Sequence, residues 1–401
     1  MSDKKPMDRR SFLLSTTAAG LGAVAIAGAA RAADAEPTPA RGAASDASPA
    51  PQQAPKPSGS KKLDEVLKVA REKLYPRCRV CPECDGQACA GEVPGMGGIG
   101  SGASFRNNVT ALQRVRLNLR SLHDGAKPDL GMTLFGQKLD VPFVISSLAG
   151  TTYNMGGKIG EEEFIEALFG GAAKVGTMAF VADGTEDPLD VYKTRLKAIT
   201  RYGRGVGVIK PRDQAELLRR IRLVEEAGAV AVAVDVDSAG RAARAAKLGE
   251  VIEPKTAKQL TELARSTKLP FIVKGVMTPD EAVLAVECGA KGIVVSNHGG
   301  RCLDHTPGTI EVLPRIAEKV KGKVTILADG GIRHGSDVLK FLALGADACL
   351  VGRPCIRGAH GGGAEGVQLV LEKIRMELAQ DMILTGTRSA RSVGPGIVTV
   401  V

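Results

Sequence analysis

Tryptophan is absent from this sequence, and only 4 tyrosines and 9 phenylalanines occur among its 401 residues. Proteins that read single-stranded nucleic acid stack the bases on aromatic side chains. The scarcity of aromatic residues therefore argues against a nucleic-acid-binding protein, although the formal net charge is +10. The lysines and arginines are spread along the whole chain and form no basic block. A charge of this kind suits small anionic ligands better.

A dinucleotide-binding motif is also missing. No Gly-x-Gly-x-x-Gly sequence follows the first strand-like segment, where an open doubly wound sheet would use it to hold a dinucleotide. The glycine-rich run at 95–100 has no strand before it, so we expect a loop there. The open sheet is therefore the second choice of architecture.

Eight short apolar runs alternate with amphipathic stretches from residue 141 onward. Between the runs, segments such as 214–227 and 279–288 repeat apolar residues at helical spacing, and glycines follow where such helices would end. Eight strand-then-helix units with short links predict a (β/α)8 TIM barrel over residues 105–390. The predicted strands are 141–146, 175–180, 205–210, 229–235, 270–274, 292–297, 324–329 and 348–352.

The N-terminal segment has the composition of an export signal. Basic residues, including Arg9 and Arg10, precede the apolar stretch 12–30, and a small-residue cleavage site follows it. The segment resembles the twin-arginine signal, which directs folded, cofactor-loaded proteins to the bacterial export machinery and the periplasm. An uncleaved membrane anchor is the alternative. We therefore divide the chain into a signal (1–33), a disordered Pro- and Ala-rich linker (34–60), a helix with a Cys-rich segment (61–104), the barrel and a tail (391–401).

Side chains suited to proton transfer and anion binding follow the later strands. Lys274 ends the fifth strand, while His298 and Arg301 follow the sixth. Barrel enzymes keep their chemistry at this end of the strands. A histidine can act as a base near neutral pH, and an arginine can bind a carboxylate through two hydrogen bonds. We predict an α-hydroxy acid site in which His298 is the base, Arg301 binds the carboxylate and Asp304 orients His298.

Two glycine-rich segments, 329–333 and 352–353, follow the seventh and eighth strands and carry Arg333 and Arg353. Barrels commonly bind a phosphate at these loops, where helix N-termini offer free N–H groups. A phosphate-bearing cofactor is therefore expected. Lys274 could place its positive charge beside a flavin ring and stabilise the reduced form.

Segments 273–276, 296–301, 303–304, 328–333 and 351–354 together resemble the FMN-dependent α-hydroxy acid dehydrogenases and oxidases. The resemblance covers residues 105–390 and implies FMN-dependent oxidation of a small L-2-hydroxy acid to the 2-oxo acid. It also implies a homo-oligomer, and it leaves the electron acceptor unknown. The residues expected at the FMN are Lys274, Ser296, Asp329, Gly330, Gly331, Arg333, Gly352 and Arg353.

The chain departs from the family at the substrate tyrosines. The third predicted strand, 205–210, contains neither the usual Tyr nor the Gln expected at the flavin. Tyr153 is a candidate substitute hydroxyl, with a packing role as its alternative. Two other functions stay open: an FMN barrel isomerase or reductase acting on another substrate, and a flavin and iron–sulfur electron carrier without a substrate.

Four cysteines, Cys78, Cys81, Cys84 and Cys89, lie within twelve residues ahead of the barrel. Their Cys-x2-Cys-x2-Cys spacing resembles a ferredoxin ligand run, although the final x4 interval is unusual. A 4Fe-4S cluster, a structural zinc ion and disulfides are the three interpretations. Export in the folded state favours a metal loaded beforehand. A cluster near the flavin would give electrons an exit and would favour a dehydrogenase over an oxidase.

Overall fold

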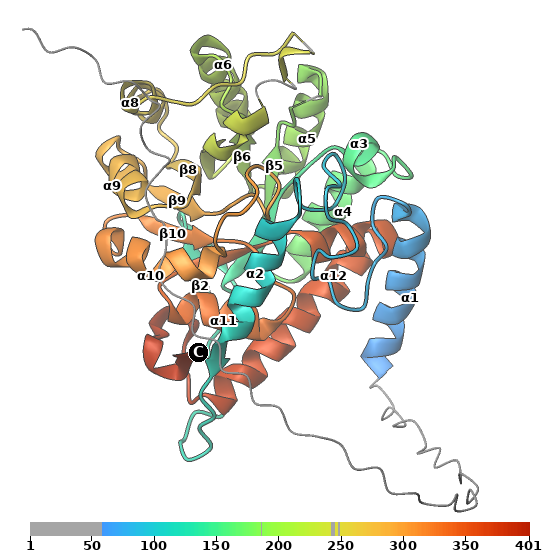
Figure 1. Ribbon diagram of the computed structural model, residues 1–401, viewed down its shortest axis with the longest axis vertical. Helices are drawn as coiled ribbons and strands as arrows, with labels where there is room; N and C mark the ends of the chain where they lie inside the picture. The colour runs from blue at the N-terminus through green and yellow to red at the C-terminus, as the bar shows by residue number, and fades with distance from the viewer. Residues whose placement is uncertain (1–57, 186, 242–244, 248) are drawn as a thin grey trace, which may run out of the picture. The chain divides into compact units, whose positions relative to one another are not determined.

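Eight parallel strands close into a barrel in the computed structural model, which describes residues 58–401 except 186, 242–244 and 248 (Figure 1). Each strand pairs with the next along the chain, and the last pairs with the first. The predicted (β/α)8 barrel is confirmed. Its strands are β4 (Phe143–Leu148), β5 (Ala179–Ala182), β6 (Val206–Ile209), β7 (Ala231–Asp235), β8 (Phe271–Val276), β9 (Gly292–Val295), β10 (Thr325–Ala328) and β11 (Ala348–Val351). The signal (1–33) and the linker up to residue 57 lie outside the described residues.

The strands bury both of their faces, which explains their nearly continuous apolar sequences. Along β7, Ala231 and Ala233 belong to a cluster inside the barrel, whereas Val232 and Val234 belong to the larger core beneath the helices. A small residue is required where a helix approaches closely. A Cβ atom on Gly207 in β6 would lie 2.4 Å from a methyl carbon of Val224.

Within the described residues, eight helices surround the barrel. Helix α6 illustrates why they form: Leu217, Ile221 and Val224 recur at helical spacing on its buried face, and the Asp213 side chain caps its first turn. None of the described helices is long and apolar enough to span a membrane. The surrounding helices are α4 (Glu161–Lys174), α5 (Leu189–Tyr202), α6 (Gln214–Glu226), α8 (Ala257–Arg265), α9 (Pro279–Glu287), α10 (Thr309–Val320), α11 (Gly335–Ala343) and α12 (Arg353–Leu384).

A β-hairpin closes the N-terminal end of the barrel. Its strands are β2 (Met132–Leu134) and β3 (Gln137–Leu139). Leu134 and Leu139 are buried and pack with the cluster inside the barrel. The interior of the barrel is therefore packed with apolar side chains at this end.

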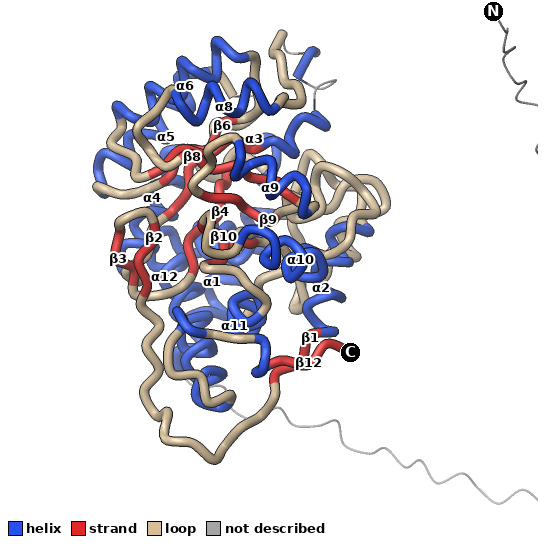
Figure 2. The backbone as a smooth tube through the Cα atoms, turned by 90° about the vertical axis from the view of Figure 1, so that its left-hand side faces the viewer, coloured by secondary structure: helices blue, strands red, loops and turns tan. Residues whose placement is uncertain are grey.

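The segments flanking the barrel pack on its outside. Helix α1 (Ser58–Leu74) lies beside α12, although the two are far apart in the sequence (Figure 1). Strand β1 (Val115–Leu117) pairs antiparallel with β12 (Val398–Val400) near the C-terminus (Figure 2). The remaining elements are the helices α2 (Ala103–Arg114) and α3 (Thr151–Met155) and the 3-10 turns Val236–Arg241, Ala390–Ser392 and Pro395–Ile397.

Candidate active site

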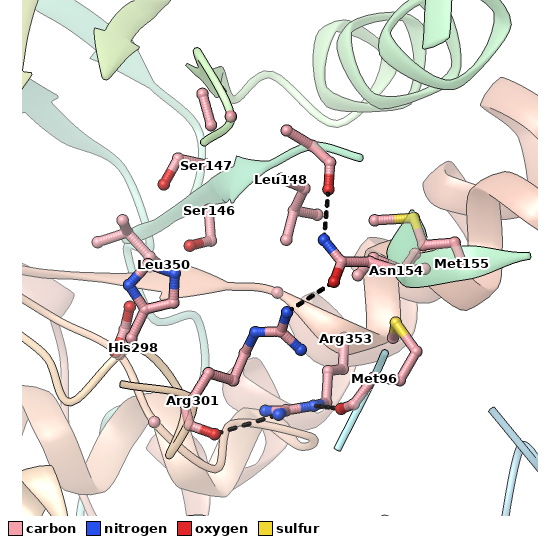
Figure 3. Close-up of a pocket in the computed structure, with 18 of the residues that line it drawn as sticks. Met96, Ser146, Ser147, Leu148, Asn154, Met155, His298, Arg301, Leu350 and Arg353 are labelled. Carbon is pink, nitrogen blue, oxygen red and sulfur yellow. Dashed lines mark hydrogen bonds between the residues drawn. The ribbon is translucent and has the colours of Figure 1, made fainter. Parts of the chain in front are cut away.

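A cavity lies at the carboxyl ends of the barrel strands (Figure 3). Gly95 and Met96 of the N-terminal extension complete its wall. Most of the predicted catalytic and FMN-binding residues line it, whereas Ser296 and Asp304 do not. The predicted residues that line the cavity are Lys274, His298, Arg301, Asp329, Gly330, Gly331, Arg333, Gly352 and Arg353.

His298 sits in a tight loop directly after β9. Its backbone has a φ of +58°, in the left-handed region, and its N–H donates to Ser296 Oγ at 3.0 Å. Ser296 therefore shapes the loop. Gly300 is needed because the N-terminal extension crosses the loop: an added Cβ atom would lie 2.3 Å from the backbone nitrogen of Phe105.

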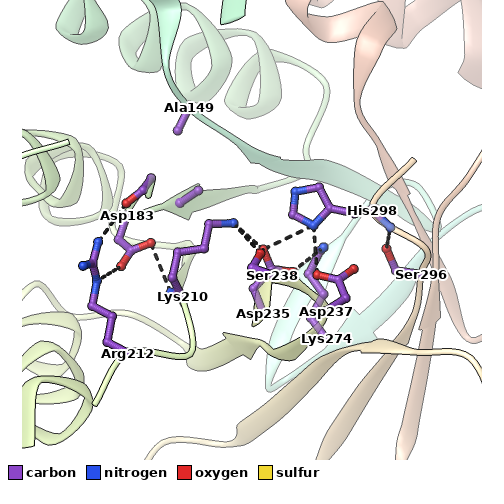
Figure 4. Close-up of polar contacts among 12 residues, drawn as sticks. Ala149, Asp183, Lys210, Arg212, Asp235, Asp237, Ser238, Lys274, Ser296 and His298 are labelled. Atoms are coloured by element: carbon purple, nitrogen blue, oxygen red, sulfur yellow. Dashed lines mark hydrogen bonds and ion pairs between the residues drawn. The ribbon is translucent and has the colours of Figure 1, made fainter. Parts of the chain in front are cut away.

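Two carboxylates behind His298 orient its ring (Figure 4). Nδ1 of His298 lies 2.9 Å from Asp237 Oδ1 and 3.5 Å from Asp235 Oδ2. Because Nδ1 contacts Asp237, the other ring nitrogen, Nε2, is available to a ligand in the cavity. Neither aspartate was identified from the sequence, although both lie at the carboxyl end of β7, where such groups are expected.

Asp235 is a fully buried anion between two lysines. Lys274 Nζ lies 2.7 Å from its Oδ1, and Lys210 Nζ lies 2.5 Å from its Oδ2. Burial alone would raise the pKa of Asp235, but Lys210 and Lys274 hold it well below its ordinary value. In turn, Asp235 raises the pKa of Lys274 against the effect of burial. Lys274 is therefore a fixed cation in the cavity wall.

His298 binds its proton unusually tightly. Burial opposes the charged form, but Cys302, Asp235 and Asp237 outweigh it and raise the pKa of His298 to about 9. This difference from the ordinary 6.5 also stabilises the folded chain. The stabilisation is complete below pH 6.5 and is lost as the pH rises through about 9.

We expect kcat/KM to rise with pH. A base must be neutral to accept a proton, so the rate should climb about tenfold per pH unit and level off near pH 9. Asp237→Asn removes one of the charges that stabilise protonated His298, so the rising part of the pH profile should shift to lower pH. The check is a pH profile of kcat/KM for both proteins. An unshifted rise in Asp237→Asn would contradict the assigned cause of the raised pKa.

Arg301 is held rigidly in the cavity wall. Its guanidinium donates to the carbonyl oxygen of Gly95 and, at 3.0 Å, to Asn154 Oδ1. Burial, together with the nearby cations Arg241 and Arg353, lowers the pKa of Arg301 to about 9. Such crowding of positive charge favours the binding of an anion.

Arg241 is a second cation for a ligand, and it was not identified from the sequence. Its Nε and one terminal nitrogen are buried and make no hydrogen bond to any residue of the described chain. Because buried polar groups normally have partners, these donors indicate a ligand that supplies acceptors. Arg241 and Arg301 line the same cavity and can together bind a carboxylate.

The other side of the cavity fits FMN. Gly330 and Gly331 have φ values of +107° and +85°, so side chains are excluded there. Within the described residues, Asp329 Oδ1 and Arg333 Nε are buried without a partner, and they offer an acceptor and a donor to ribityl and phosphate groups. Helix α12 begins at the cavity, after Gly352, and its N-terminus favours an anion.

Asp304 does not orient His298, so that prediction is wrong. Its carboxylate accepts hydrogen bonds from the backbone N–H groups of Ser101, at 2.6 Å, and Ser104, at 3.4 Å. These N–H groups lie at the start of α2 and attract the carboxylate, which lowers its pKa to about 2 despite some burial. Asp304 thus anchors the N-terminal extension to the catalytic loop.

The four clustered cysteines lie together, and all of them line a second cavity. No three of their sulfur atoms lie within 4.8 Å of one another, and none forms a disulfide within the described chain. Met96 and Arg353 line both this cavity and the larger one.

Together, the barrel and its cationic cavity define a cofactor-dependent (β/α)8 enzyme that acts on a small anion. A family model described as FMN-dependent dehydrogenase matches residues 95–257 and 242–400. The chain therefore belongs to the FMN-dependent dehydrogenase family. It is an oxidoreductase that acts on CH–OH groups and uses FMN.

Curated relatives and solved structures agree with this membership. The chain is 33% identical over 330 residues to a 2-hydroxyacid oxidase of Dictyostelium discoideum, covering 74% of this chain and 82% of the relative. It is 31% identical to human 2-hydroxyacid oxidase 1 over 74% of this chain and 88% of the relative. The crystal structure of a mandelate oxidase superimposes with a TM-score of 0.68 at 29% identity, covering 83% of this chain and 98% of that chain.

Proposed function

We propose that this enzyme oxidises a small L-2-hydroxy acid to the 2-oxo acid, with His298 as the base and Arg301 as the carboxylate anchor. The observation that carries the proposal is the common cavity of these two side chains, with Asp237 bound to the far nitrogen of the imidazole. Membership in a family whose relatives are 2-hydroxyacid oxidases supports the substrate class.

Each residue has a distinct part in this mechanism. Arg301 and Arg241 bind the carboxylate and leave the substrate hydroxyl facing His298. His298 takes a proton through Nε2, and Asp237 and Asp235 stabilise the imidazolium that results. Bound FMN supplies the oxidising power by accepting two electrons from the substrate. Lys274 places a fixed positive charge in the same cavity.

Anaerobic mixing with a panel of 2-hydroxy acids tests the proposal. The L enantiomers should bleach the flavin absorption and release one oxo acid for each flavin bleached, whereas primary alcohols without a carboxylate should not. Absence of bleaching across the panel would contradict the proposal. Turnover without net bleaching would identify an isomerase.

The N-terminal extension adds two proposals of its own. Arg9 and Arg10 ahead of an apolar stretch support export to the periplasm by the twin-arginine route, in which a folded enzyme takes its cofactor along. The grouping of Cys78, Cys81 and Cys84 with Cys89 around one cavity supports a bound metal centre. The resemblance to the family also supports a homo-oligomer.

A further inference from the structure

The cavity between the four cysteines is surrounded by positive charge. Arg353 and Arg357 line it, and Arg333 donates to Cys84 Sγ at 3.3 Å. Arg357 also approaches Cys78 Sγ, at 3.9 Å. Thiols are neutral in their ordinary state, so they do not balance the charge of three partly buried arginines.

An unused hydrogen-bond donor points to the missing partner. Nε of Arg357 is buried and has no partner among the described residues. Donors to sulfur are already in place, because the N–H of Val80 donates to Cys78 Sγ at 3.4 Å. A ligand with several acceptors and a net negative charge would complete this site.

The spacing of the thiols distinguishes between candidate ligands. A tetrahedral zinc ion bonded to sulfur at about 2.3 Å requires its thiolates to be roughly 3.8 Å apart. No three of these sulfur atoms lie even within 4.8 Å of one another, and all four cysteines are free. A cluster of four irons and four sulfides is a larger body, holds its thiolates farther apart and carries negative charge.

The cysteine cavity adjoins the cavity that fits FMN. Met96 and Arg353 belong to the walls of both, and the Arg353 guanidinium lies 3.7 Å from the centre of the Phe105 ring, another wall residue of the cysteine cavity. The two sites therefore share part of one wall. On the outer side, Cys81 and Cys89 are only partly buried, so a partner molecule can approach them.

We propose that Cys78, Cys81, Cys84 and Cys89 bind a four-iron cluster that carries electrons singly from the flavin to an external one-electron acceptor. This inference rests on the proposed function, because the electrons originate in the hydroxy acid. The C–H and O–H bonds of the substrate break, a C=O bond forms, and two electrons and two protons are released. One proton passes to His298 and then to solvent, and the other is released as the flavin is reoxidised. The cluster is reduced and emptied twice per turnover, so two acceptor molecules are consumed.

Metal analysis of the anaerobically purified full-length enzyme tests the cluster directly. We expect about four irons and four acid-labile sulfides per chain. Cys81→Ser should lose most of both, whereas Cys288→Ala, which removes a thiol between barrel elements, should keep them. The flavin content of each variant reports whether the barrel is folded. Zinc without sulfide, or disulfides without metal, would overturn the proposal.

Electron transfer is tested separately in the same preparation. Adding an L-2-hydroxy acid without oxygen should produce the electron paramagnetic resonance signal of a reduced cluster, and ferricyanide should then be consumed at two equivalents per oxo acid. Flavin bleaching without a cluster signal would overturn the relay and leave the hydroxy acid oxidation standing. Absence of bleaching would instead contradict the proposed function, while the iron and sulfide content would still decide whether the cluster exists.

Discussion

His298→Ala is expected to lower kcat/KM for a 2-hydroxy acid by about 10²–10⁴-fold, the usual contribution of a positioned general base. The variant removes the imidazole that lines the cavity and contacts Asp237 through Nδ1. Most of the loss should appear in kcat, because the carboxylate still finds Arg301. Stopped-flow measurement of flavin bleaching gives the rate of this step directly.

His305 offers a matched control for this substitution. It lies in the same loop region, its side chain is 77% exposed, and its contact with Asp304 at 3.7 Å faces away from the cavity wall. His305→Ala should leave the bleaching rate unchanged, and both variants should keep their flavin. A His298→Ala enzyme that bleaches as fast as the parent protein would show that another group takes the proton.

The barrel could be predicted because parallel strands that are buried on both faces have continuous apolar sequences. Residues 292–295 are apolar on both faces, and all eight such runs correspond to barrel strands. The predicted ends of the strands agree less well with the structure. The predicted start at residue 175 precedes β5 by four residues, because Val175 caps α4 and Gly176, with a φ of +72°, turns the chain.

The candidate site was only partly predictable, for a similar reason. His298 and Arg301 were found because they share one short motif. Asp237 and Arg241 lie about sixty residues earlier, and closure of the barrel brings Asp237 to His298 and Arg241 to the cavity wall. Asp304 shows the opposite error: it is near His298 in sequence, but the free N–H groups at the start of α2 attract its carboxylate more strongly.

The cysteine site, too, depends partly on a local sequence pattern and partly on residues that are distant in the sequence. The spacing of the thiols is a local pattern and marked them as a possible group of ligands. The arginines around them come from a distant part of the sequence: Arg333 follows β10, and Arg353 and Arg357 lie in the first turns of α12. Only the tertiary fold brings these arginines to the thiols. The cysteine cavity is therefore a positively charged site, which the spacing of the cysteines alone does not indicate.

Arg301→Met is expected to weaken the transition-state interaction of a 2-hydroxy acid by about 2–5 kcal/mol, a loss of roughly 30- to several-thousandfold in kcat/KM. Methionine keeps much of the volume but removes the charge and the paired donors that bind a carboxylate. Arg301→Lys should recover only part of the loss, because an ammonium group lacks the planar, two-pronged geometry. The exposed Arg388 provides the control, and Arg388→Met should change little.

A neutral substrate separates charge recognition from general damage to the cavity. If Arg301 acts through the carboxylate, the amide of the same hydroxy acid should be a poor substrate of the parent enzyme, and Arg301→Met should barely change its rate. If Arg301→Met instead slows the acid and the amide by the same factor, Arg301 serves to hold Gly95 and Asn154 in place, and the carboxylate must bind elsewhere. Arg241, whose buried donors have no partner among the described residues, would then be the anchor. The comparison of two substrates with two proteins therefore assigns the carboxylate to one arginine or the other.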